Sequence, residues 1–537
     1  MASTNFIPGT VITSEWLNEV DEAIFETVPD IVAKAYGDAT FVGTGSDDST
    51  AVQAFVDANK GKTLVIKRAT FAGVLLSGST YSNTKLYIQD HTLATRPTSA
   101  TNNFGGAWVG LIIQSCDGVM LDYVGNGNRT VQPDEEHIYL VGVAGATNMS
   151  VPRFIGREIR GDGMYVSQAS WTSSSATTTN LQIGFFGCYN SADDGRNALS
   201  LIAYDGVSIG TFESIKVGAV VGGVRQPGGL DIEPNFTYQT CNSCTIGSVT
   251  VRSTGTTCFG VQGKDAGSEA YVVTGLSVGA LDSINTLGTS ATDGTWALNL
   301  FMVNDVTIRG RISHTNATNG VAGRIDSAIG VVANIIVTQA NKGLLLGENG
   351  WVRKSDIHVN IKSYAGSVSG IGLRACGLTD VALKGHISGA GNASSTFAVQ
   401  VRSNGRALTQ TNVTYSIDVP KDANNARGYR NETGDTVAFT NCKISNCRVT
   451  GYASFSVALD GFGVAGIRKH DIAGVTESAA VPGNGGWTQG DIVNNSTPTK
   501  DANNMTVMGW VRLTTGTGAV SGTDWAIMNV SHVSPAV

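Results

Sequence analysis

The sequence contains few charged residues, few prolines and no long apolar run. Asp, Glu, Lys and Arg make up 15% of the 537 residues, and proline occurs 11 times. The net charge of −7 comes without a Lys/Arg cluster, so we expect no nucleic-acid partner. No run reaches the about 18 apolar residues of a membrane helix, and the first residues lack the basic and apolar regions of a signal peptide. We therefore expect neither membrane insertion nor a secretion signal.

The cysteines do not form the pattern of a metal site or a disulfide framework. Without a secretion signal, free buried thiols are the expected state. Cys241 and Cys244 form a C-x-x-C pair, but no second pair and no histidine lies near it. This favours two small side chains in a strand-turn over zinc or redox chemistry. A D-x-D-x-D-G calcium loop is also missing, so we expect no metal and no other cofactor.

Glycine, serine, threonine and asparagine take the place of the missing charge. Glycine alone occurs 67 times, whereas the hydrophobic share of 41% is close to that of ordinary soluble domains. Many short runs rich in Val and Ile lie between these polar residues, which favours many strands joined by tight turns. A disordered chain would carry more charge and fewer apolar residues.

Two segments near the N-terminus are predicted to be helical. Residues 14–28 place apolar side chains at three- and four-residue steps on one face, and we expect this lone amphipathic helix to pack on copies of itself, or else on its own domain. Residues 50–58 follow a turn rich in Gly and Asp, and Thr50 with Gln53 fits a capping box.

One pattern recurs from about residue 64 to residue 470: a pair of small polar residues precedes a short β-branched run. Most neighbouring copies are roughly 22 to 37 residues apart, in the range of a solenoid repeat. Apolar and polar positions alternate in each copy, so one face looks inward. No helix-length amphipathic segment separates the copies, which disfavours a barrel with helical crossovers. The copies begin at Asp117, Asn148, Asn180, Asp205, Asn242, Asn304, Ser355, Thr379, Thr411 and Thr440.

The pattern predicts an all-β fold, a parallel β-helix (solenoid), over residues 64–470. A β-propeller is the alternative, but its blades need about 40 residues and four antiparallel strands each. The ends of a solenoid need cover because they expose a sheet edge and a core cross-section. We expect the turn and helix of residues 37–63 to cover the first coil.

The residue pattern of the sequence changes after about residue 470. Residues 471–537 predict a small antiparallel β module that is rich in tryptophan. We expect Trp487, Trp510 and Trp525 to form its core, with sugar stacking as the alternative.

Several segments resemble bacteriophage tailspikes and capsular polysaccharide depolymerases with a pectate-lyase-like β-helix. GTGSDDSTAVQAF (43–55) is similar to the G-D-G-x-x-D-D-T-x-A-x-Q opening of the pectate-lyase superfamily, although its first Asp is missing here. FIPGTVITSEWLNEVDEAI resembles the N-terminal segment of phage tail fibres and tailspikes. GGLDIEPN (228–235) resembles the central stretch of capsular depolymerases, and the final G-W-x-x-G-D-I-V-x-N…G-W…W pattern resembles their C-terminal modules.

This resemblance implies a right-handed coil, a homotrimer and carbohydrate substrates. It also implies a place in the virion, as part of the phage tail that acts outside the cell at the bacterial surface. Residues 1–36 would then be the helical neck that attaches to other phage tail proteins. The module at 471–537 would serve trimerisation or carbohydrate binding.

Hydrolysis of a glycosidic bond usually needs two carboxyl groups, one acting as acid and the other as base or nucleophile. Asp231 and Glu233 lie two residues apart in GGLDIEPN. In an extended strand both would point to one face, about 6.6 Å apart at the backbone. The spacing suits a catalytic pair, and a solvated strand face is the alternative.

Three further carboxylates are candidates for the same groove. Asp162 and Asp194 precede Asp231 by about one coil each, and adjacent strands lie about 4.8 Å apart. Glu136 belongs to the earlier run DEEH (134–137) and joins them if its neighbours face outward. Each of these residues alone is more often a turn residue, and it is their register that favours catalysis. Stacked carboxylates would also raise one another's proton affinity.

Side chains around these carboxylates could hold an acidic sugar or stack on its ring. For the arginines, ion pairing with neighbouring carboxylates is the favoured alternative. The substrate-binding candidates are Arg160, Arg196, Arg225, His137, Tyr165 and Trp171.

The sequence therefore predicts a tailspike that binds and hydrolyses a bacterial surface polysaccharide, which would be a capsule, an exopolysaccharide or an O-antigen. A lyase acting by β-elimination on a uronate is the enzymatic alternative. A receptor-binding spike without catalysis and a purely structural fibre are the other readings. The sugar and its linkage depend on loop shape, which the sequence does not give.

Overall fold

The computed structural model describes residues 37–531 except for a set of short stretches. The predicted helix at 14–28, with the rest of residues 1–36, lies outside the described residues. The other stretches outside the description are 98–102, 105, 171–174, 219, 222–223, 226, 254, 268, 287–294, 317–319, 363–370, 389–396, 404–405, 422–426, 433–436, 451, 453–457, 463, 484–485, 501–502, 504 and 532–537.

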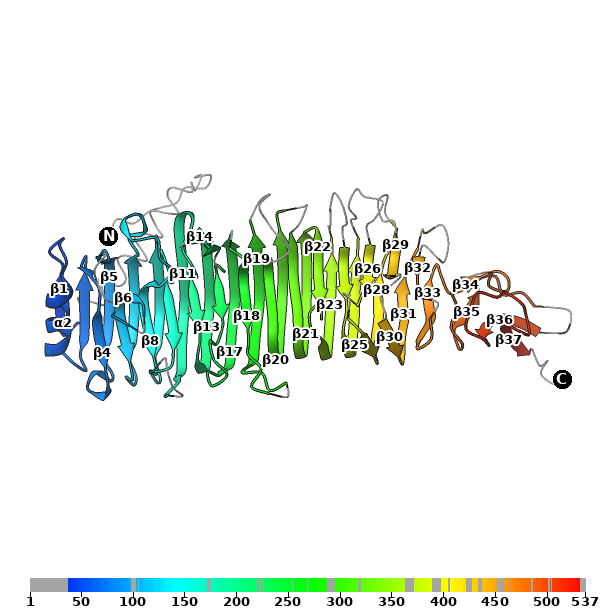
Figure 1. Ribbon diagram of the computed structural model, residues 1–537, viewed down its shortest axis with the longest axis horizontal. Coiled ribbons are helices and arrows are strands. Elements are labelled where there is room, and N and C mark those ends of the chain that lie inside the picture. The colour runs from blue at the N-terminus through cyan, green and yellow to red at the C-terminus, as the bar shows by residue number, and fades with distance from the viewer. Residues whose placement is uncertain are drawn as a thin grey trace, which may run out of the picture.

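The chain forms a parallel β-helix, as predicted. Every pairing described in its main sheet is parallel, and most strands pair with the corresponding strand one coil earlier and one coil later. Figure 1 shows the strands side by side along the long axis, with α2 (Ser49–Ala58) near one end and the C-terminal strands at the other. The right hand of the coil stays a prediction from the resemblance.

Two stacks of strands carry the coil. The first stack contains β1 (Ala39–Val42), β2 (Thr63–Lys67), β5 (Lys85–Leu93), β7 (Met120–Asn126), β9 (Ser150–Arg157), β11 (Thr178–Asp194), β13 (Tyr204–Val217), β17 (Cys241–Ser253), β19 (Val273–Asn285), β23 (Val352–Ile361), β25 (Leu378–Ile387), β28 (Thr414–Asp418), β31 (Cys442–Arg448) and β33 (Ile467–Ala473). The second contains β4 (Val74–Ser77), β6 (Trp108–Gln114), β8 (Ile138–Ala144), β10 (Met164–Ser167), β12 (Leu199–Leu201), β16 (Leu230–Ile232), β18 (Thr257–Gln262), β22 (Lys342–Leu346), β24 (Ile371–Ala375), β26 (Phe397–Val401), β29 (Arg427–Asn431) and β32 (Leu459–Asp460).

The remaining elements connect or flank these stacks. The long strands β20 (Trp296–His314) and β21 (Val321–Gln339) run through both of them. The shorter elements are β3 (Thr70–Phe71), β27 (Leu408–Thr411), β30 (Val437–Thr440), the hairpin β14 (Val220–Val221) and β15 (Val224–Arg225), and the 3-10 turns at Ser79–Tyr81 and Arg129–Val131.

The recurring polar pair in the sequence marks one turn of the coil. The backbone there adopts a positive φ, for example 50° at Asn148, 55° at Asn412 and 65° at Gly118. Glycine, asparagine and aspartate tolerate this left-handed conformation better than other residues. The pattern therefore repeats because each coil turns with the same backbone geometry.

Side-chain ladders join these turns from coil to coil. Asn148 Nδ2 donates to Asp117 Oδ1 over 2.8 Å, and Asn180 Nδ2 donates to Asn148 Oδ1 over 3.0 Å. A second ladder starts at Asp380, which accepts from Asn412 over 2.7 Å, and Asn412 accepts from Asn441 over 2.8 Å. Each ladder begins at an aspartate, because a carboxylate can accept the hydrogen bond of the next asparagine and has no N–H group that would need an acceptor of its own.

Glycines mark a second corner in the long strands of the first stack. A Cβ on Gly210 would lie 2.5 Å from the Gly184 carbonyl oxygen, and one on Gly247 would lie 2.5 Å from the Gly210 oxygen. No side chain fits so close to the neighbouring backbone. The strands therefore bend at the same position in successive coils.

The core of the early coils is an aromatic stack. The ring centroids of Tyr123 and Phe154 lie 5.0 Å apart, those of Phe154 and Phe186 4.6 Å, and those of Phe186 and Phe212 5.3 Å. Burying such rings inside the coil provides much of the driving force for stacking. All eight cysteines are free and buried, as expected: Cys116, Cys188, Cys241, Cys244, Cys258, Cys376, Cys442 and Cys447.

Helix α2 covers the first coil with its buried residues Val52 and Val56. The predicted capping box is wrong, because the helix begins at Ser49 and its N-cap, Asp48, makes no side-chain cap bond. The Gln53 side chain instead forms two hydrogen bonds with the backbone of β4. Its Oε1 accepts from Leu75 N over 2.7 Å, and its Nε2 donates to Leu75 O over 3.1 Å. Gln53 thus fixes the helix to the exposed edge of the coil.

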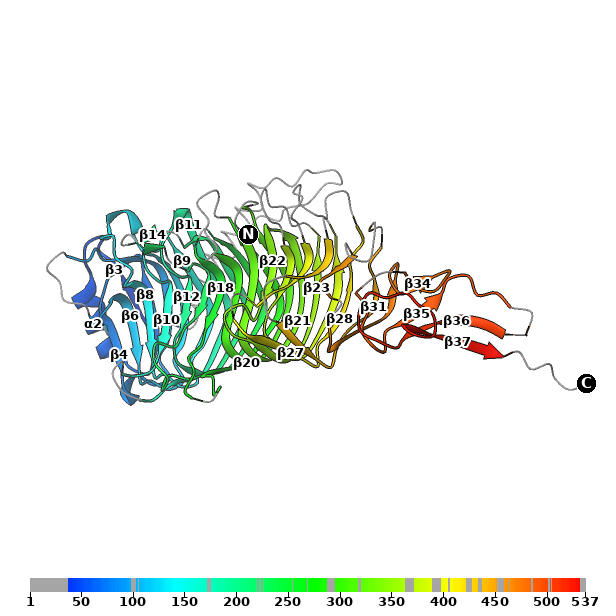
Figure 2. The ribbon, with the colours of Figure 1, turned by 45° about the vertical axis from the view of Figure 1, so that its right-hand side comes forward.

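The C-terminal module contains the sheet β34 (Glu477–Ser478), β35 (Ile492–Asn495), β36 (Met505–Arg512) and β37 (Trp525–Ser531). β36 pairs antiparallel with both β35 and β37, and Figure 2 shows these strands projecting beyond the last coils. Trp487, Trp510 and Trp525 are buried together, so the prediction of a tryptophan core is confirmed, and these rings are not available for sugar stacking. No helix in the described part of the chain is long and apolar enough to cross a membrane.

Candidate active site

Four successive strands of the second stack position most of the predicted site residues. Glu136 and His137 immediately precede β8, and Asp162 lies just before β10. Arg196 lies just before β12, and Asp231 lies within β16. Since β8, β10, β12 and β16 are consecutive neighbours in the sheet, residues about a hundred positions apart in sequence come together on one face.

The register of these strands corrects one prediction. Tyr165 is opposite Ser200, and Ser200 is opposite Asp231. Asp194 is the last residue of β11 in the other stack, where its backbone pairs with Val217. The predicted register of Asp194 with Asp162 and Asp231 is therefore wrong, because β11 runs on past its bend and ends on a different face of the coil.

A buried ion pair lies at the centre of the cluster. Asp162 is completely buried, and its Oδ2 accepts from Arg196 Nη1 over 3.0 Å and from Ser200 Oγ over 2.8 Å. Burial raises the pKa of Asp162, and the charge of Arg196 opposes that rise. For Arg196 the alternative of ion pairing is thus confirmed.

Asp231 lies beside this pair and is 1% exposed. Its Oδ2 accepts from Asn197 Nδ2 over 3.2 Å, and Asn197 Nδ2 also lies 2.9 Å from Ser200 Oγ. The pKa of Asp231 is well above its usual range, first because the carboxyl is buried and then because the charge of Glu233 opposes its ionisation. Asp231 therefore keeps its proton to a higher pH than an exposed aspartate does.

Asp231 and Glu233 differ in exposure. Leu230 and Ile232 point into the core, as the alternation predicts. Glu233 is partly exposed, whereas Asp231 is buried. The alternative of a solvated strand face therefore does not hold for Asp231, whose side chain is buried and accepts a hydrogen bond from Asn197 of the preceding coil.

The outer rim of the cluster is formed by Glu136 and His137, whose side chains are 41% and 51% exposed. Their nearest charged atoms, Glu136 Oε1 and His137 Nε2, are 3.4 Å apart. Glu136 Oε2 lies 3.8 Å from Arg196 Nε, and His137 Nδ1 lies 3.0 Å from the Tyr139 hydroxyl. The rim therefore connects solvent to the buried Asp162–Arg196 pair.

The other predicted binding residues lie elsewhere or are packed. Tyr165 is 2% exposed and stacks on Tyr139 with the ring centroids 4.9 Å apart, so it offers no free face to a sugar. Arg160 forms an ion pair with Asp134 at 3.1 Å. Ion pairing with a neighbouring carboxylate was the alternative to sugar binding for this arginine too. Arg225 ends the short hairpin strand β15, where its backbone pairs with Val220. Trp171 lies outside the described residues.

Three residues of the cluster were missed by the sequence reasoning: Asn197, Ser200 and Tyr139. Asn197 directly follows Arg196, so its position in the sequence was a usable signal. Tyr139 lies two residues after His137, which was a signal of the same kind. Ser200 carries no such signal, because only the register between coils brings it to the carboxylates.

The cluster has buried polar atoms without a hydrogen-bond partner in the described structure. They are Asp162 Oδ1, Asp231 Oδ1 and Arg196 Nε. Native proteins rarely leave such atoms unpaired, and those that remain often lie where a ligand or a catalytic step uses them. A Cβ on Gly260, the neighbour of Asp231 in the next strand, would lie 3.5 Å from Asp231 Oδ1 and 3.0 Å from the Thr257 methyl group, so a glycine and a threonine methyl border that side of the carboxyl.

The arrangement combines a proton-retaining carboxyl, a partly exposed carboxyl beside it and an arginine held by a third carboxylate. Such a set can donate a proton to a leaving oxygen and hold an anionic or hydroxyl group of a substrate. Within the described residues, no three His, Cys, Asp or Glu side chains gather in a way that could hold a metal ion.

Comparisons with known proteins give a structural likeness but no family. No protein-family model matches the sequence, and no curated protein matches it. Among solved structures, the A-module of the mannuronan C-5 epimerase AlgE6 of Azotobacter vinelandii is similar to this chain at 16% sequence identity. The alignment covers 75% of this chain and 96% of that module, with a TM-score of 0.32. The strand pairings themselves establish the parallel β-helix.

Proposed function

We propose that the protein binds a bacterial surface polysaccharide and hydrolyses its glycosidic bonds. The observation that carries this proposal is the pairing of Asp231, whose pKa is raised by burial and by Glu233, with a neighbouring carboxyl group that is open to solvent. Glycosidases rely on two carboxyl groups whose surroundings separate their proton affinities.

In this proposal Glu233 is the catalytic residue and Asp231 its positioning partner. Glu233 donates a proton to the leaving glycosidic oxygen as the bond to the anomeric carbon breaks. A water molecule supplies the oxygen that joins the anomeric carbon, and Glu136 at the rim accepts the proton that this water loses. Asp231 then passes its own proton to Glu233 for the next cycle and regains one from solvent, to which Glu136 releases the proton that it took from the water. Arg196, held by Asp162, binds an acidic or hydroxyl group of the sugar.

A lyase is the second candidate, favoured by the contact between His137 Nδ1 and the Tyr139 hydroxyl at 3.0 Å. An exposed imidazole beside Arg196 could remove the proton next to a uronate carboxyl, whose charge the arginine would neutralise. Elimination would leave an unsaturated sugar, whereas hydrolysis adds water across the bond.

The resemblance to tailspikes supplies the biological setting of the proposal. The protein would form a homotrimer in the virion and join other phage tail proteins through residues 1–36. It would act outside the cell, at the bacterial surface.

The test incubates the purified protein with capsules from several bacterial hosts and identifies the released oligosaccharides by mass. We expect fragments that carry one added water each and show no ultraviolet absorbance from an unsaturated sugar. Glu233→Gln should abolish release. Asp231→Asn should reduce it by at least tenfold and shift its pH profile, whereas Asp205→Asn, at an exposed carboxylate of β13, should leave release unchanged.

Other outcomes would overturn hydrolysis at this cluster. Ultraviolet-absorbing fragments would establish the lyase instead. Polymer that is bound but stays intact would indicate a receptor-binding spike, and full activity of both Glu233→Gln and Asp231→Asn would place the chemistry elsewhere.

A further inference from the structure

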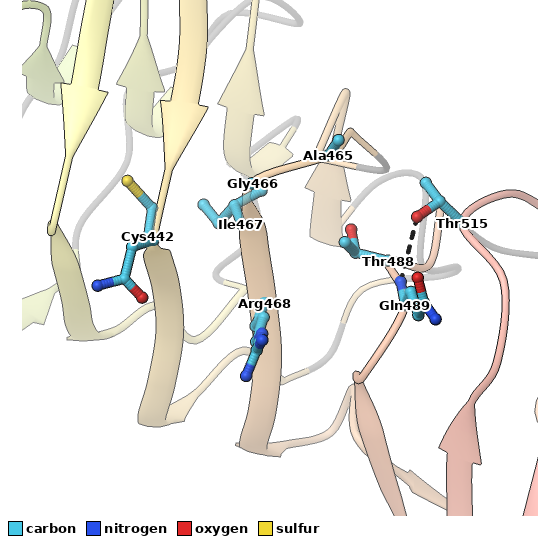
Figure 3. A pocket seen from close by; sticks show the side chains of 9 residues that line it. Cys442, Ala465, Gly466, Ile467, Arg468, Thr488, Gln489 and Thr515 are labelled. Atoms are coloured by element: carbon cyan, nitrogen blue, oxygen red, sulfur yellow. Dashed lines mark hydrogen bonds between the residues drawn. The ribbon is translucent and has the colours of Figure 1, made fainter.

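The junction between the last coil and the C-terminal module contains a polar cleft, remote in sequence from the carboxyl cluster. Its volume is about 390 Å³, within the size range of small-molecule sites. The last two strands of the first stack, β31 and β33, line one side, and the loops that carry Gln489 and Thr515 line the other. Figure 3 shows Arg468 on β33, between Cys442 on β31 and Gln489 in the facing loop.

Arg468 supplies a positive charge that the described structure does not neutralise. It is exposed, and its side chain forms no ion pair with any described residue. Lys443, its partner in register on β31, is also exposed and also lacks an acidic partner among the described residues. Two cations on strands about 4.8 Å apart repel each other, and this occurs in a chain whose net charge is −7.

The remaining lining offers hydrogen bonds of the kind that sugars use. Asn441 donates its Nδ2 to Asn412 and so presents Oδ1 as the free end of the asparagine ladder. Gln489 is exposed, and its backbone N–H donates to Thr515 Oγ1 over 3.2 Å. Amide and hydroxyl groups around a cation suit a ligand that carries both a carboxylate and hydroxyl groups.

Gly490 lies beside the arginine. Its φ is +89°, and a Cβ at this position would lie 3.8 Å from Arg468 Nε, at van der Waals distance from the guanidinium. Because residue 490 is a glycine, no side chain from it packs on Arg468 at the point where the module meets the coil.

We propose that this cleft is a second saccharide site that binds the carboxylate of an acidic sugar through Arg468, with Lys443 strengthening the attraction. Asn441 and Gln489 bind the sugar's hydroxyl groups. The proposal does not depend on hydrolysis at the carboxyl cluster, because none of its residues belongs to that cluster.

The test measures binding of methyl glucuronide to the full-length protein by NMR or calorimetry, with methyl glucoside and inorganic phosphate as separate probes. We expect the glucuronide to bind at least tenfold more tightly than the neutral glucoside. Arg468→Gln should weaken glucuronide binding at least tenfold and Lys443→Gln severalfold. Arg309→Gln, at an exposed arginine of β20 without an ion pair in the described structure, is the matched control and should change nothing.

A further variant separates the two sites. Glu233→Gln should leave glucuronide binding to the cleft intact, whether or not it abolishes polymer cleavage. The proposal is overturned if no probe binds, if the neutral glucoside binds equally well, or if Arg468→Gln binds as the parent does while its thermal unfolding is unchanged. Tight binding of phosphate with none of the glucuronide would show a simple anion site and would overturn the assignment to a sugar.

Discussion

At the scale of single residues, Asp231 has the least favourable surroundings for a charge in the candidate site. It is 1% exposed, its Oδ2 receives a neutral amide rather than a cation, and the charge of the neighbouring Glu233 opposes its ionisation. Arg196 instead binds Asp162. The fold therefore tolerates Asp231 best in its protonated form, which is the form that a proton reservoir needs.

Asp231→Asn should stabilise the protein in a pH-dependent way. The folded-state pKa of Asp231 lies above its usual value, so the stabilisation linked to its proton is complete below the unfolded value of about 3.9 and is lost as pH rises through the folded value. Asparagine carries no such charge. The variant should gain about 0.5–2 kcal/mol at neutral and alkaline pH, and this gain should shrink toward about pH 4.

Thermal unfolding over a range of pH measures this effect. Asp205→Asn makes the same change at an exposed carboxylate and should leave the profile of the parent unaltered. A gain that is independent of pH, or a loss of stability at alkaline pH, would contradict the burial of an ionisable Asp231.

At the scale of elements, the asparagine ladders hold successive turns of the coil in register. Asn412 has a φ of 55°, donates to Asp380 and accepts from Asn441. Asn412→Ala forces a Cβ-bearing side chain without hydrogen bonds into the left-handed region and should cost about 2 kcal/mol. Asn412→Gly removes only the ladder bonds and should cost about half as much.

Chemical denaturation of the two Asn412 variants separates the two contributions. Equal losses for alanine and glycine would show that the backbone conformation contributes nothing. No loss in either variant would show that the ladder does not support the coil.

The last coil and the C-terminal module are joined by a buried ion pair. Lys469 of β33 and Asp491 are both completely buried, with 3.0 Å between Nζ and Oδ2. Burial lowers the pKa of Lys469 and raises that of Asp491, and their mutual attraction opposes both shifts. Asp491 also accepts the backbone N–H groups of Lys469 and Thr488, so it fixes the module to the strand.

Removing one member of this pair should cost more than removing both charges. Lys469→Met leaves an uncompensated buried carboxylate and should destabilise the junction by about 3–5 kcal/mol. Lys469→Met combined with Asp491→Asn removes both charges while one backbone acceptor remains, and should recover most of that loss. Limited proteolysis and thermal unfolding compare the variants, and a double variant as unstable as the single one would contradict this reading.

At this scale, part of the fold and of the candidate site could be predicted from the sequence, and part could not. The polar pair before each strand predicted the coil because a positive φ restricts the choice of residues at the turn, and the alternation around Asp231 predicted which neighbours face the core. Asp194 was misplaced because coil lengths vary, so that counting residues does not give the register. Ser200 was not predicted to belong to the cluster, because a serine in a strand has no local feature that distinguishes it and only the register brings it to the carboxylates.

At the scale of the whole molecule, exposed apolar side chains gather near one end. Ten large apolar side chains are exposed in the described part of the chain, and five of them belong to residues 508–530: Met508, Leu513, Val520, Ile527 and Val530. β37 is also the last strand of its sheet, and in the described part of the chain it pairs with β36 and otherwise only through a single bridge from Trp525 to Ser521. Exposed apolar side chains on an edge strand are a typical surface for association with another chain.

This surface supports self-association through the C-terminal module, with the homotrimer of the tailspike resemblance as the expected product. The parent protein should then sediment at about three times its chain mass of 55.8 kDa. Ile527→Asp places a charge on the surface, 46% exposed in the single chain, and should shift the protein toward monomer because a charge buried at an interface lacks a partner. Val42→Asp makes the same change at a side chain that is 50% exposed at the opposite end of the molecule and should leave the assembly intact. A monomeric parent, or a trimer that survives Ile527→Asp but not Val42→Asp, would remove the C-terminal module from the interface.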